Sequence, residues 1–380
     1  MDQQSALVSV VIPSYNHRRF IGEAVDGVLR QTHANVECII VDDGSRDGSP
    51  EYLKERYANE PRVRLFSREN RGAHNTLNEA IGHARGQFIS ILNSDDVYAD
   101  TRLERMLAAA REANGPFFGI SAVEIVDEAG RPCTGGPRGY YERVCQKAAG
   151  GPPSAGFWVG NIAMTTSNFF FSREVFDTLG GFRSLRYAHD WDWALRVTER
   201  HGVRRLEEPL LHYRVHDTNT ISESNIWKHV CENAFVFASA LGRQGLAPRG
   251  VPNGCSASEV MSFLLRNESF LPLPTLYLRS LGQTDAELES ALADGSLERA
   301  LKDLLDRSGV SLDLLLSAEH LQGLVRKANA PAEARPQPET GLLEDGKRLM
   351  AKHLPEVVVR NASLMRTLLH AMRARLAPRA

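Results

Sequence analysis

The first part of the chain alternates short apolar runs with amphipathic segments, and this alternation constrains the fold more than any other feature. Apolar runs rich in β-branched residues occupy positions 7–12, 36–41, 63–67 and 88–92. An apolar run of this length bounded by polar residues is typical of a buried strand. Strands that alternate with helices of about 10–15 residues predict a mostly parallel, twisted sheet flanked by helices. The predicted fold class is therefore α/β.

Each predicted strand ends in a polar cluster. The clusters combine hydroxyl, amide, guanidinium and carboxylate groups: Ser14, Tyr15 and Asn16; Asp42 and Asp43; Asn70 and Arg71; and Asn93, Asp95 and Asp96. Ligands of open α/β sheets bind outside the carboxyl ends of the strands, so we expect these clusters to meet at one edge. No Gly-x-Gly-x-x-Gly follows the first strand, so the dinucleotide fingerprint is absent. The clusters instead predict a site for a base, a ribose and a metal-bound diphosphate.

Asp95 and Asp96 follow the fourth apolar run directly. Adjacent carboxylates repel one another unless a positive charge stands between them, and hard divalent cations bind a few carboxylates together with substrate phosphates. Turns also favour aspartate, asparagine and serine, so an isolated Asn-Ser-Asp-Asp fits a simple turn equally well. The surrounding clusters favour the metal–phosphate interpretation.

Composition restricts the class of function and the location. A chain of 380 residues suggests about two domains, and a net charge of −2 argues against a nucleic-acid partner. The five cysteines show no Cys-x-x-Cys, which indicates neither a disulfide framework nor a zinc site. The N-terminus lacks the features of a signal peptide, and no apolar run approaches a membrane span. We expect a cytoplasmic protein, or one attached peripherally to the cytoplasmic face of a membrane.

Several short motifs, in the same order, resemble those of the family-2 glycosyltransferases with the GT-A fold. They are Val8–Asn16, Val41–Ser45, Asn70–Gly72, Ala84–Gly86 and Leu92–Asp96. The resemblance covers residues 1–225 and implies a GT-A domain that binds a nucleotide-diphosphate sugar. It also implies a divalent cation, Mn²⁺ or Mg²⁺, as the cofactor.

The resemblance assigns roles to particular residues in the donor site. Asp43 falls on the position that contacts the nucleoside base, and Asn93-Ser94-Asp95 falls on the Asp-x-Asp motif that contacts the ribose and carries the metal. Asn93 replaces the usual first aspartate; its amide can still bond a ribose hydroxyl, while Asp95 carries more of the metal. The other residues expected to bind the donor or the metal are Pro13, Tyr15, Asn70 and Arg214 for the donor and His216 as a metal ligand.

The segment from Tyr187 to Arg196 predicts the start of a helix with two interpretations. In the first, Asp190 is an N-cap, Asp192 interacts with the helix dipole, and the tryptophans fill core. Spacing alone favours this structural interpretation. The resemblance reverses the preference, because the family has a Glu-Asp pair here and its Asp is the catalytic base; His189-Asp190 is the matching pair. The secondary candidates, for acceptor contacts, are Asp96, His189, Trp191 and Asp192.

The remaining chain predicts no catalytic cluster. Residues 130–160 contain several glycines and prolines without a period and are expected to form a loop near the acceptor. Residues 226–330 predict a helical domain, including helical spacing over 285–305. Residues 331–341 form a Pro-rich linker, and 342–380 predict basic amphipathic helices. Such helices bind an anionic membrane, or pack on the helical domain or a second protomer; the packing interpretation is slightly favoured.

We therefore predict an inverting, metal-dependent glycosyltransferase. Its donor is a nucleotide-diphosphate sugar, most simply a UDP-sugar, and its acceptor a hydroxyl of a glycan or lipid-linked glycan in cell-surface polysaccharide synthesis. One alternative is a sugar-nucleotide pyrophosphorylase, but Pro13–Asn16 lacks the Gly-rich, basic loop that such an enzyme would carry. The other is a non-catalytic subunit that binds a nucleotide sugar or a glycan, which Asn93 would favour.

Overall fold

The computed structural model describes residues 6–217, 219, 226–243, 266–267 and 271–308. The chain divides into two compact units, Met1–Ser224 and Asn225–Ala380. The predicted linker at 331–341 and the predicted basic helices at 342–380 lie outside the described residues, as do parts of the predicted helical domain.

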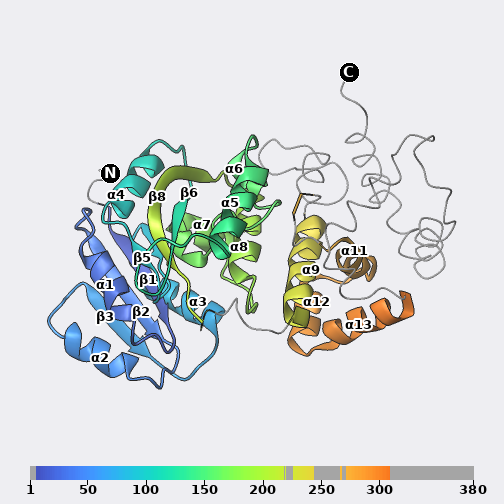
Figure 1. Ribbon diagram of the computed structural model, residues 1–380, viewed down its shortest axis with the longest axis horizontal. Helices are drawn as coiled ribbons and strands as arrows, with labels where there is room; N and C mark the ends of the chain where they lie inside the picture. The colour runs from blue at the N-terminus through green and yellow to red at the C-terminus, as the bar shows by residue number, and fades with distance from the viewer. Residues whose placement is uncertain (1–5, 218, 220–225, 244–265, 268–270, 309–380) are drawn as a thin grey trace. The chain divides into compact units, whose positions relative to one another are not determined.

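The first unit is built on an eight-stranded sheet in the order β3-β2-β1-β4-β7-β6-β8-β5, flanked by helices (Figure 1). The strands are β1 Val8–Ser14, β2 Val36–Asp42, β3 Val63–Ser67, β4 Phe88–Ile91, β5 Val97–Tyr98, β6 Phe118–Val126, β7 Phe170–Ser172 and β8 Arg204–Arg214. Strands β1 to β4 pair in parallel, as do β6 and β8. Strand β7 is antiparallel to β4 and β6, and β5 is antiparallel to β8. The predicted α/β class is confirmed.

Helices of the first unit alternate with these strands. They are α1 Ile21–Leu29, α2 Ser49–Arg56, α3 Ala73–His83, α4 Arg102–Arg111, α5 Pro137–Ala148, α6 Pro153–Gly156, α7 Arg173–Leu179 and α8 His189–Thr198, with a short 3-10 helix, η2, at Thr166–Asn168. All residues of β2 are buried, because both faces of a parallel sheet are covered. The register places Ser14 opposite Asp42, so the polar residues that follow β1 and β2 lie at the same edge.

Residues 130–160 are not the loop that the sequence predicted. They contain α5 and α6, each of which begins with a proline in its first turn. Proline is well tolerated there because the first helical N–H groups have no intrahelical acceptor. Tyr141 and Val144 are buried three residues apart on α5. Polar residues around this narrow apolar stripe hide the helical period.

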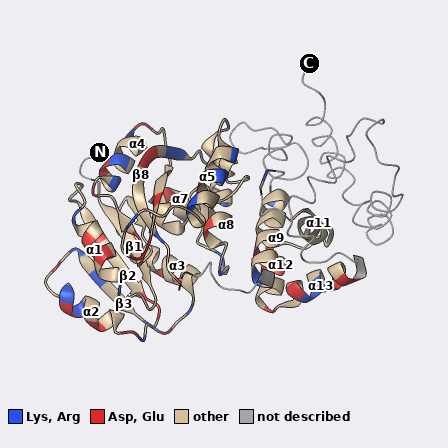
Figure 2. Cartoon of the chain, in the orientation of Figure 1, with Lys and Arg blue, Asp and Glu red and all other residues tan. Residues whose placement is uncertain are grey.

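The second unit contains α9 Ile226–Arg243, α11 Pro272–Ser280, α12 Asp285–Ala293 and α13 Ser296–Ser308. The helical spacing over 285–305 is divided between α12 and α13, and Gly295 lies between them with a φ of 74°, a conformation that suits glycine at helix ends. Charges of both signs lie along α13 (Figure 2), including a Lys302–Glu298 ion pair of 2.6 Å. Among the described residues, no helix combines the length and apolarity needed to cross a membrane.

Candidate functional site

Three potential metal ligands meet at the carboxyl edge of the sheet. His17 follows β1, Asp95 follows β4 and His216 follows β8, and their ligand atoms all lie within 4.8 Å of one another. Asp95 and His216 are buried, with the Asp95 Oδ2 and His216 Nε2 atoms 2.9 Å apart. We call this group the His–Asp–His cluster. It joins two predicted metal ligands, Asp95 and His216, with a histidine that the sequence did not single out.

Neighbouring side chains fix both imidazole rings. Phe20 stacks on His216 with ring centroids 4.9 Å apart and contacts the ring of His17 edge-on. The Ser94 hydroxyl lies 2.7 Å from His17 Nδ1. A pocket of about 510 Å³ adjoins the cluster. Its lining includes five charged residues beside the two histidines, namely Arg18, Arg19, Asp47, Glu128 and Asp217.

The two adjacent carboxylates of the turn after β4 have different environments. Burial opposes ionisation of Asp95, but the hydrogen bond from His216 and the charges of both histidines outweigh it and lower the pKa of Asp95. Burial and the charge of Asp95 raise the pKa of Asp96 well above its usual value. The Asp96 oxygens accept hydrogen bonds from the Ser167 hydroxyl at 2.5 Å and the Arg214 N–H at 2.9 Å. Asp95 therefore interacts with the two histidines of the cluster. Asp96 instead joins the turn after β4 to Ser167 and Arg214 through hydrogen bonds.

Asn93 contacts the segment that carries η2. Its side-chain amide donates to Thr165 Oγ1 at 2.9 Å, and its backbone N–H donates to Ser167 Oγ at 2.8 Å. Arg102, fully buried, donates to the backbone and side-chain oxygens of Asn168 and so fixes η2. These supporting residues were missed by sequence reasoning, because contacts across about seventy residues leave no local pattern.

Asp43 lies beneath the loop that follows β3. Its carboxylate accepts hydrogen bonds from the N–H groups of Arg71 and Gly72, at 2.8 and 2.9 Å, and forms an ion pair with Arg68. Gly44 is required here, because its φ is 78° and a Cβ atom would lie 2.9 Å from the Asn70 nitrogen. Oδ2 of Asp43 has one hydrogen bond from this loop, which leaves it able to accept another from a ligand.

Three further predicted donor-site residues lie at the same edge. Pro13 is half-buried in β1 and Tyr15 is 48% exposed just after it, while Asn70 is exposed in the loop after β3. The side chain of Asn16 accepts a hydrogen bond from the Arg46 N–H at 2.8 Å, which joins the loops after β1 and β2. An exposed tyrosine at this position offers an aromatic face to a ligand.

Arg214 is buried at the end of β8. Its guanidinium donates to the backbone oxygens of Asp95 and Glu128 and forms a 2.6 Å ion pair with Glu23. These contacts use three of its five N–H groups. Arg214 therefore holds the turn of Asp95 against α1, and its role toward a donor stays a prediction.

Asp190 lies in the first turn of α8, whose N-cap residue is Ala188 without a side-chain cap. The interpretation of Asp190 as the N-cap is therefore wrong. Its carboxylate accepts hydrogen bonds from the Trp191 N–H and from Asn161 Nδ2, both at 2.7 Å. Burial raises the pKa of Asp190, although the charge of His189 and these hydrogen bonds partly oppose the shift. A buried carboxylate with a raised pKa suits a general base.

The neighbours of Asp190 have separate roles. The Trp191 indole donates to the Phe157 carbonyl at 2.7 Å and packs in the protein. His189 Nε2 lies 3.3 Å from Thr166 Oγ1, and its buried Nδ1 atom has no hydrogen-bond partner among the described residues. Of these two residues, His189 has the ring nitrogen without a hydrogen-bond partner among the described residues.

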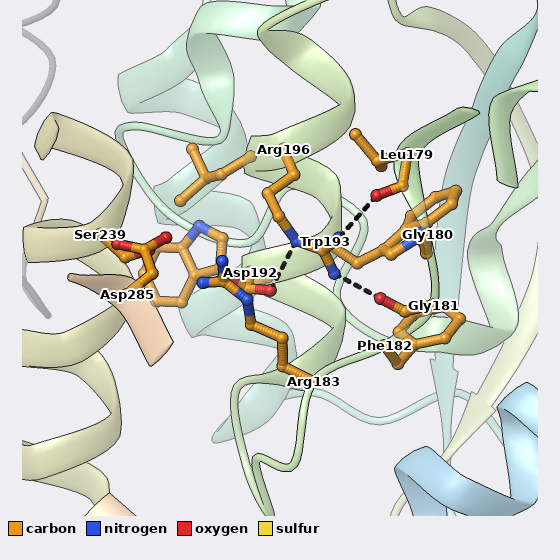
Figure 3. A network of polar contacts seen from close by, with 12 residues as sticks. Leu179, Gly180, Gly181, Phe182, Arg183, Asp192, Trp193, Arg196, Ser239 and Asp285 are labelled. Atoms are coloured by element: carbon orange, nitrogen blue, oxygen red, sulfur yellow. Dashed lines mark hydrogen bonds and ion pairs between the residues drawn. The ribbon is translucent and has the colours of Figure 1, made fainter. Parts of the chain in front are cut away.

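Asp192 belongs to a structural network instead (Figure 3). It is fully buried and pairs with Arg183 at 3.2 Å and Arg196 at 2.9 Å. Arg196 also donates to the carbonyl oxygens of Leu179 and Gly181. Asp192 thus fixes the segment after α7, and it also lies in the first turn of α8, where the structural interpretation placed it.

The cluster and Asp190 belong to one region. Burial raises the pKa of Tyr213, and the charges of Asp96, Asp95 and Asp190 add to this shift. The segment around η2 contacts both the turn after β4 and the start of α8, since Thr165 accepts a hydrogen bond from Asn93 and Thr166 lies beside His189. Carboxylates separated by about a hundred residues therefore act on one partly buried tyrosine.

Comparison with known proteins relates the first part of the chain to a known family. The family described as Glycosyl transferase family 2 matches residues 9–148. Chondroitin synthase of Escherichia coli is 30% identical over 247 residues, covering 63% of this chain and 33% of that protein. The putative teichuronic acid biosynthesis glycosyltransferase TuaG of Bacillus subtilis is 35% identical over 133 residues, covering 35% of this chain and 52% of its own length.

The crystal structure of TarS from S. aureus has the same fold, with a TM-score of 0.51 and 17% identity over 68% of this chain and 43% of that chain. The chain spans about a third to a half of the length of the curated relatives described above. The sheet, the matched motifs and these likenesses agree with one another. Residues 9–148 therefore match a family-2 glycosyltransferase domain, and the first unit has the GT-A fold.

Proposed function

We propose that the chain transfers a sugar from a nucleotide-diphosphate donor to an acceptor hydroxyl with inversion at the anomeric carbon. The observation that carries this proposal is the placement of a buried carboxylate with a raised pKa, Asp190, in the same region as the His–Asp–His cluster. The match of residues 9–148 to the family supports it. A site for a donor phosphate beside a general base is the arrangement that glycosyl transfer to a hydroxyl requires.

The donor occupies the carboxyl edge of β1 to β4. Asp43 accepts a hydrogen bond from the base through its remaining Oδ2 lone pair, and exposed Tyr15 and Asn70 contact the nucleoside. Asn93 contributes its amide to the ribose, with Pro13 shaping the edge. UDP is the simplest nucleotide for this site.

The His–Asp–His cluster fits a divalent cation. One carboxylate and two imidazoles within 4.8 Å form a donor set that such ions accept, and Asp95 stays ionised because its pKa is lowered. Asp95 and His216 would hold the ion. When bound, the cation supplies positive charge that stabilises the departing diphosphate.

Asp190 performs the proton transfer. Its carboxylate takes the proton of the acceptor hydroxyl while that oxygen attacks the anomeric carbon. The bond from this carbon to the diphosphate oxygen breaks, and the nucleoside diphosphate leaves with the electron pair. Asn161 holds the base in place with a 2.7 Å hydrogen bond to Oδ2. A single displacement of this kind inverts the configuration.

The acceptor is proposed to be a glycan or lipid-linked glycan in polysaccharide synthesis. Support comes from relatives named as a chondroitin synthase and a teichuronic acid biosynthesis protein. His189, which is partly exposed at the start of α8, is a candidate contact for this acceptor.

A thermal-shift screen of nucleotide-diphosphate sugars with Mn²⁺ or Mg²⁺ tests the proposal. A donor present at about 100 times its Kd stabilises the folded state by ~2.7 kcal/mol. We expect a UDP-sugar to stabilise the chain and to be hydrolysed slowly. Stabilisation without any hydrolysis would favour the non-catalytic binding subunit, and no stabilisation by any donor would contradict the donor site.

A further inference from the structure

We infer that His17 is a third protein ligand of the cation held by Asp95 and His216, and that it makes the site favour first-row transition ions over Mg²⁺. The inference deepens the proposed function and rests on it. His17 lies in the loop between β1 and α1, near the start of the first unit, whereas His216 follows β8 near its end. The three ligand atoms lie within 4.8 Å of one another.

The environment of His17 suits a metal-bound imidazole. The Ser94 hydroxyl lies 2.7 Å from its Nδ1 atom, and a hydrogen bond at one ring nitrogen fixes the tautomer and orientation of a ligating histidine. Ser94 is buried and directly precedes Asp95. The ring meets that of His216 edge-on, with centroids 5.5 Å apart and an interplanar angle of 90°. One turn therefore positions two ligands, and the two imidazoles do not stack against each other.

Asn93 explains why a further ligand is needed. Its neutral amide stands where the family pattern has a carboxylate, and the amide donates its hydrogen bond to Thr165 at 2.9 Å. The cation then has one carboxylate, Asp95, from this turn. His17 adds a nitrogen donor to the cluster, which makes it a set of two histidines and one carboxylate.

This donor set determines the class of ion. Mg²⁺ prefers oxygen ligands and keeps several water molecules. Imidazole suits first-row transition ions, and two histidines with one carboxylate hold such an ion with positions left open for other ligands. We therefore expect Co²⁺ and Mn²⁺ to bind more tightly than Mg²⁺, with His17 contributing to the difference.

The experiment measures Mn²⁺ binding by the full chain through the electron paramagnetic resonance signal of free Mn²⁺, followed by displacement with Co²⁺ or Mg²⁺. The variants are His17→Ala and His17→Asp. The backbone carbonyl of His17 accepts from the N–H groups of Phe20 and Ile21, both at 2.9 Å, and both variants retain this start of α1. The matched control is His33→Ala, because His33 bonds the Ala6 carbonyl near the other end of β1.

We expect His17→Ala to weaken Mn²⁺ binding by at least the roughly 10–100-fold that loss of a supporting residue costs, and to reduce the preference for Co²⁺ over Mg²⁺. His17→Asp should shift the preference toward Mg²⁺, and His33→Ala should bind like the wild type. Equal Mn²⁺ affinity in wild type and a folded His17→Ala overturns the inference and leaves the proposed function standing. If His17→Ala does not fold, an unchanged ion preference in His17→Asp overturns it. Absence of Mn²⁺ binding by the wild type contradicts the cation of the proposed function itself.

Discussion

Replacing Asp190 by asparagine separates its chemistry from its place in the fold. The variant keeps the size of the side chain and removes the proton acceptor. General-base catalysis contributes about 10²–10⁴-fold, which corresponds to ~2.7–5.5 kcal/mol of transition-state stabilisation. We expect Asp190→Asn to reduce turnover by this factor, while the affinity for the donor stays close to that of the wild type.

The fold should tolerate this change because two effects oppose each other. The pKa of Asp190 is raised by burial, so its ionised form destabilises the folded state above that pKa, and the neutral amide removes this cost. Against this, Asn has one acceptor oxygen where Asp190 uses both, for Trp191 and Asn161. Losing one such hydrogen bond costs about 1 kcal/mol. The melting temperature should therefore change little.

The pH dependence gives a second readout. A base must be deprotonated, so wild-type kcat/KM should fall as the pH decreases through the pKa of Asp190, which lies above its usual value of 3.8. The decrease in kcat/KM at low pH that is due to protonation of Asp190 should be absent in Asp190→Asn. Steady-state kinetics over a pH series, with saturating cation, makes the comparison. Near-wild-type turnover by Asp190→Asn under conditions where chemistry limits the rate would refute the assignment.

Three other substitutions test the supporting architecture. Asp192→Asn removes the buried carboxylate that pairs with Arg183 and Arg196, and removing one member of a buried ion pair costs about 3–5 kcal/mol of unfolding free energy; an unchanged stability in unfolding experiments would contradict the structural role. Asp43→Ala removes an acceptor for the nucleoside base. Calorimetry should show nucleoside-diphosphate affinity reduced about 10–100-fold, because hydrogen bonds to charged groups contribute ~1.5–3 kcal/mol. An affinity equal to that of the wild type would mean that Asp43 does not contact the base. Asn93→Asp places its carboxylate toward Thr165, so Mn²⁺ affinity should change by less than about tenfold, the lower limit for a residue that supports a ligand; a larger increase would indicate that residue 93 binds the ion.

Local patterns predicted the parts of the site that follow strands. Asp43 and Asp95 could be placed at one sheet edge because buried runs precede them and parallel strands end together. His17 had the same local signal, since it follows β1 within a few residues. It escaped notice because a single histidine after a polar loop has no pattern of its own.

Contacts between distant segments could not be predicted in this way. The Asp95–His216 pair spans 121 positions, and the resemblance, not the spacing, brought these two residues together. The buried pairs of Asp192 with Arg183 and Arg196 depend on how α8 packs against the segment after α7. The helix α5 was missed because its buried face consists of few residues among polar ones.

Inverting transfer from a nucleotide-diphosphate donor is the central claim, and real-time proton NMR tests it without a known acceptor. A panel of α-linked nucleotide-diphosphate sugars is incubated with the full chain and Mn²⁺, and the anomer released by slow hydrolysis is recorded before mutarotation. Attack by a water molecule that Asp190 activates predicts that the β anomer forms first, and that Asp190→Asn releases it about 10²–10⁴-fold more slowly. Initial release of the α anomer, or failure to cleave any donor that the chain binds, would contradict the account.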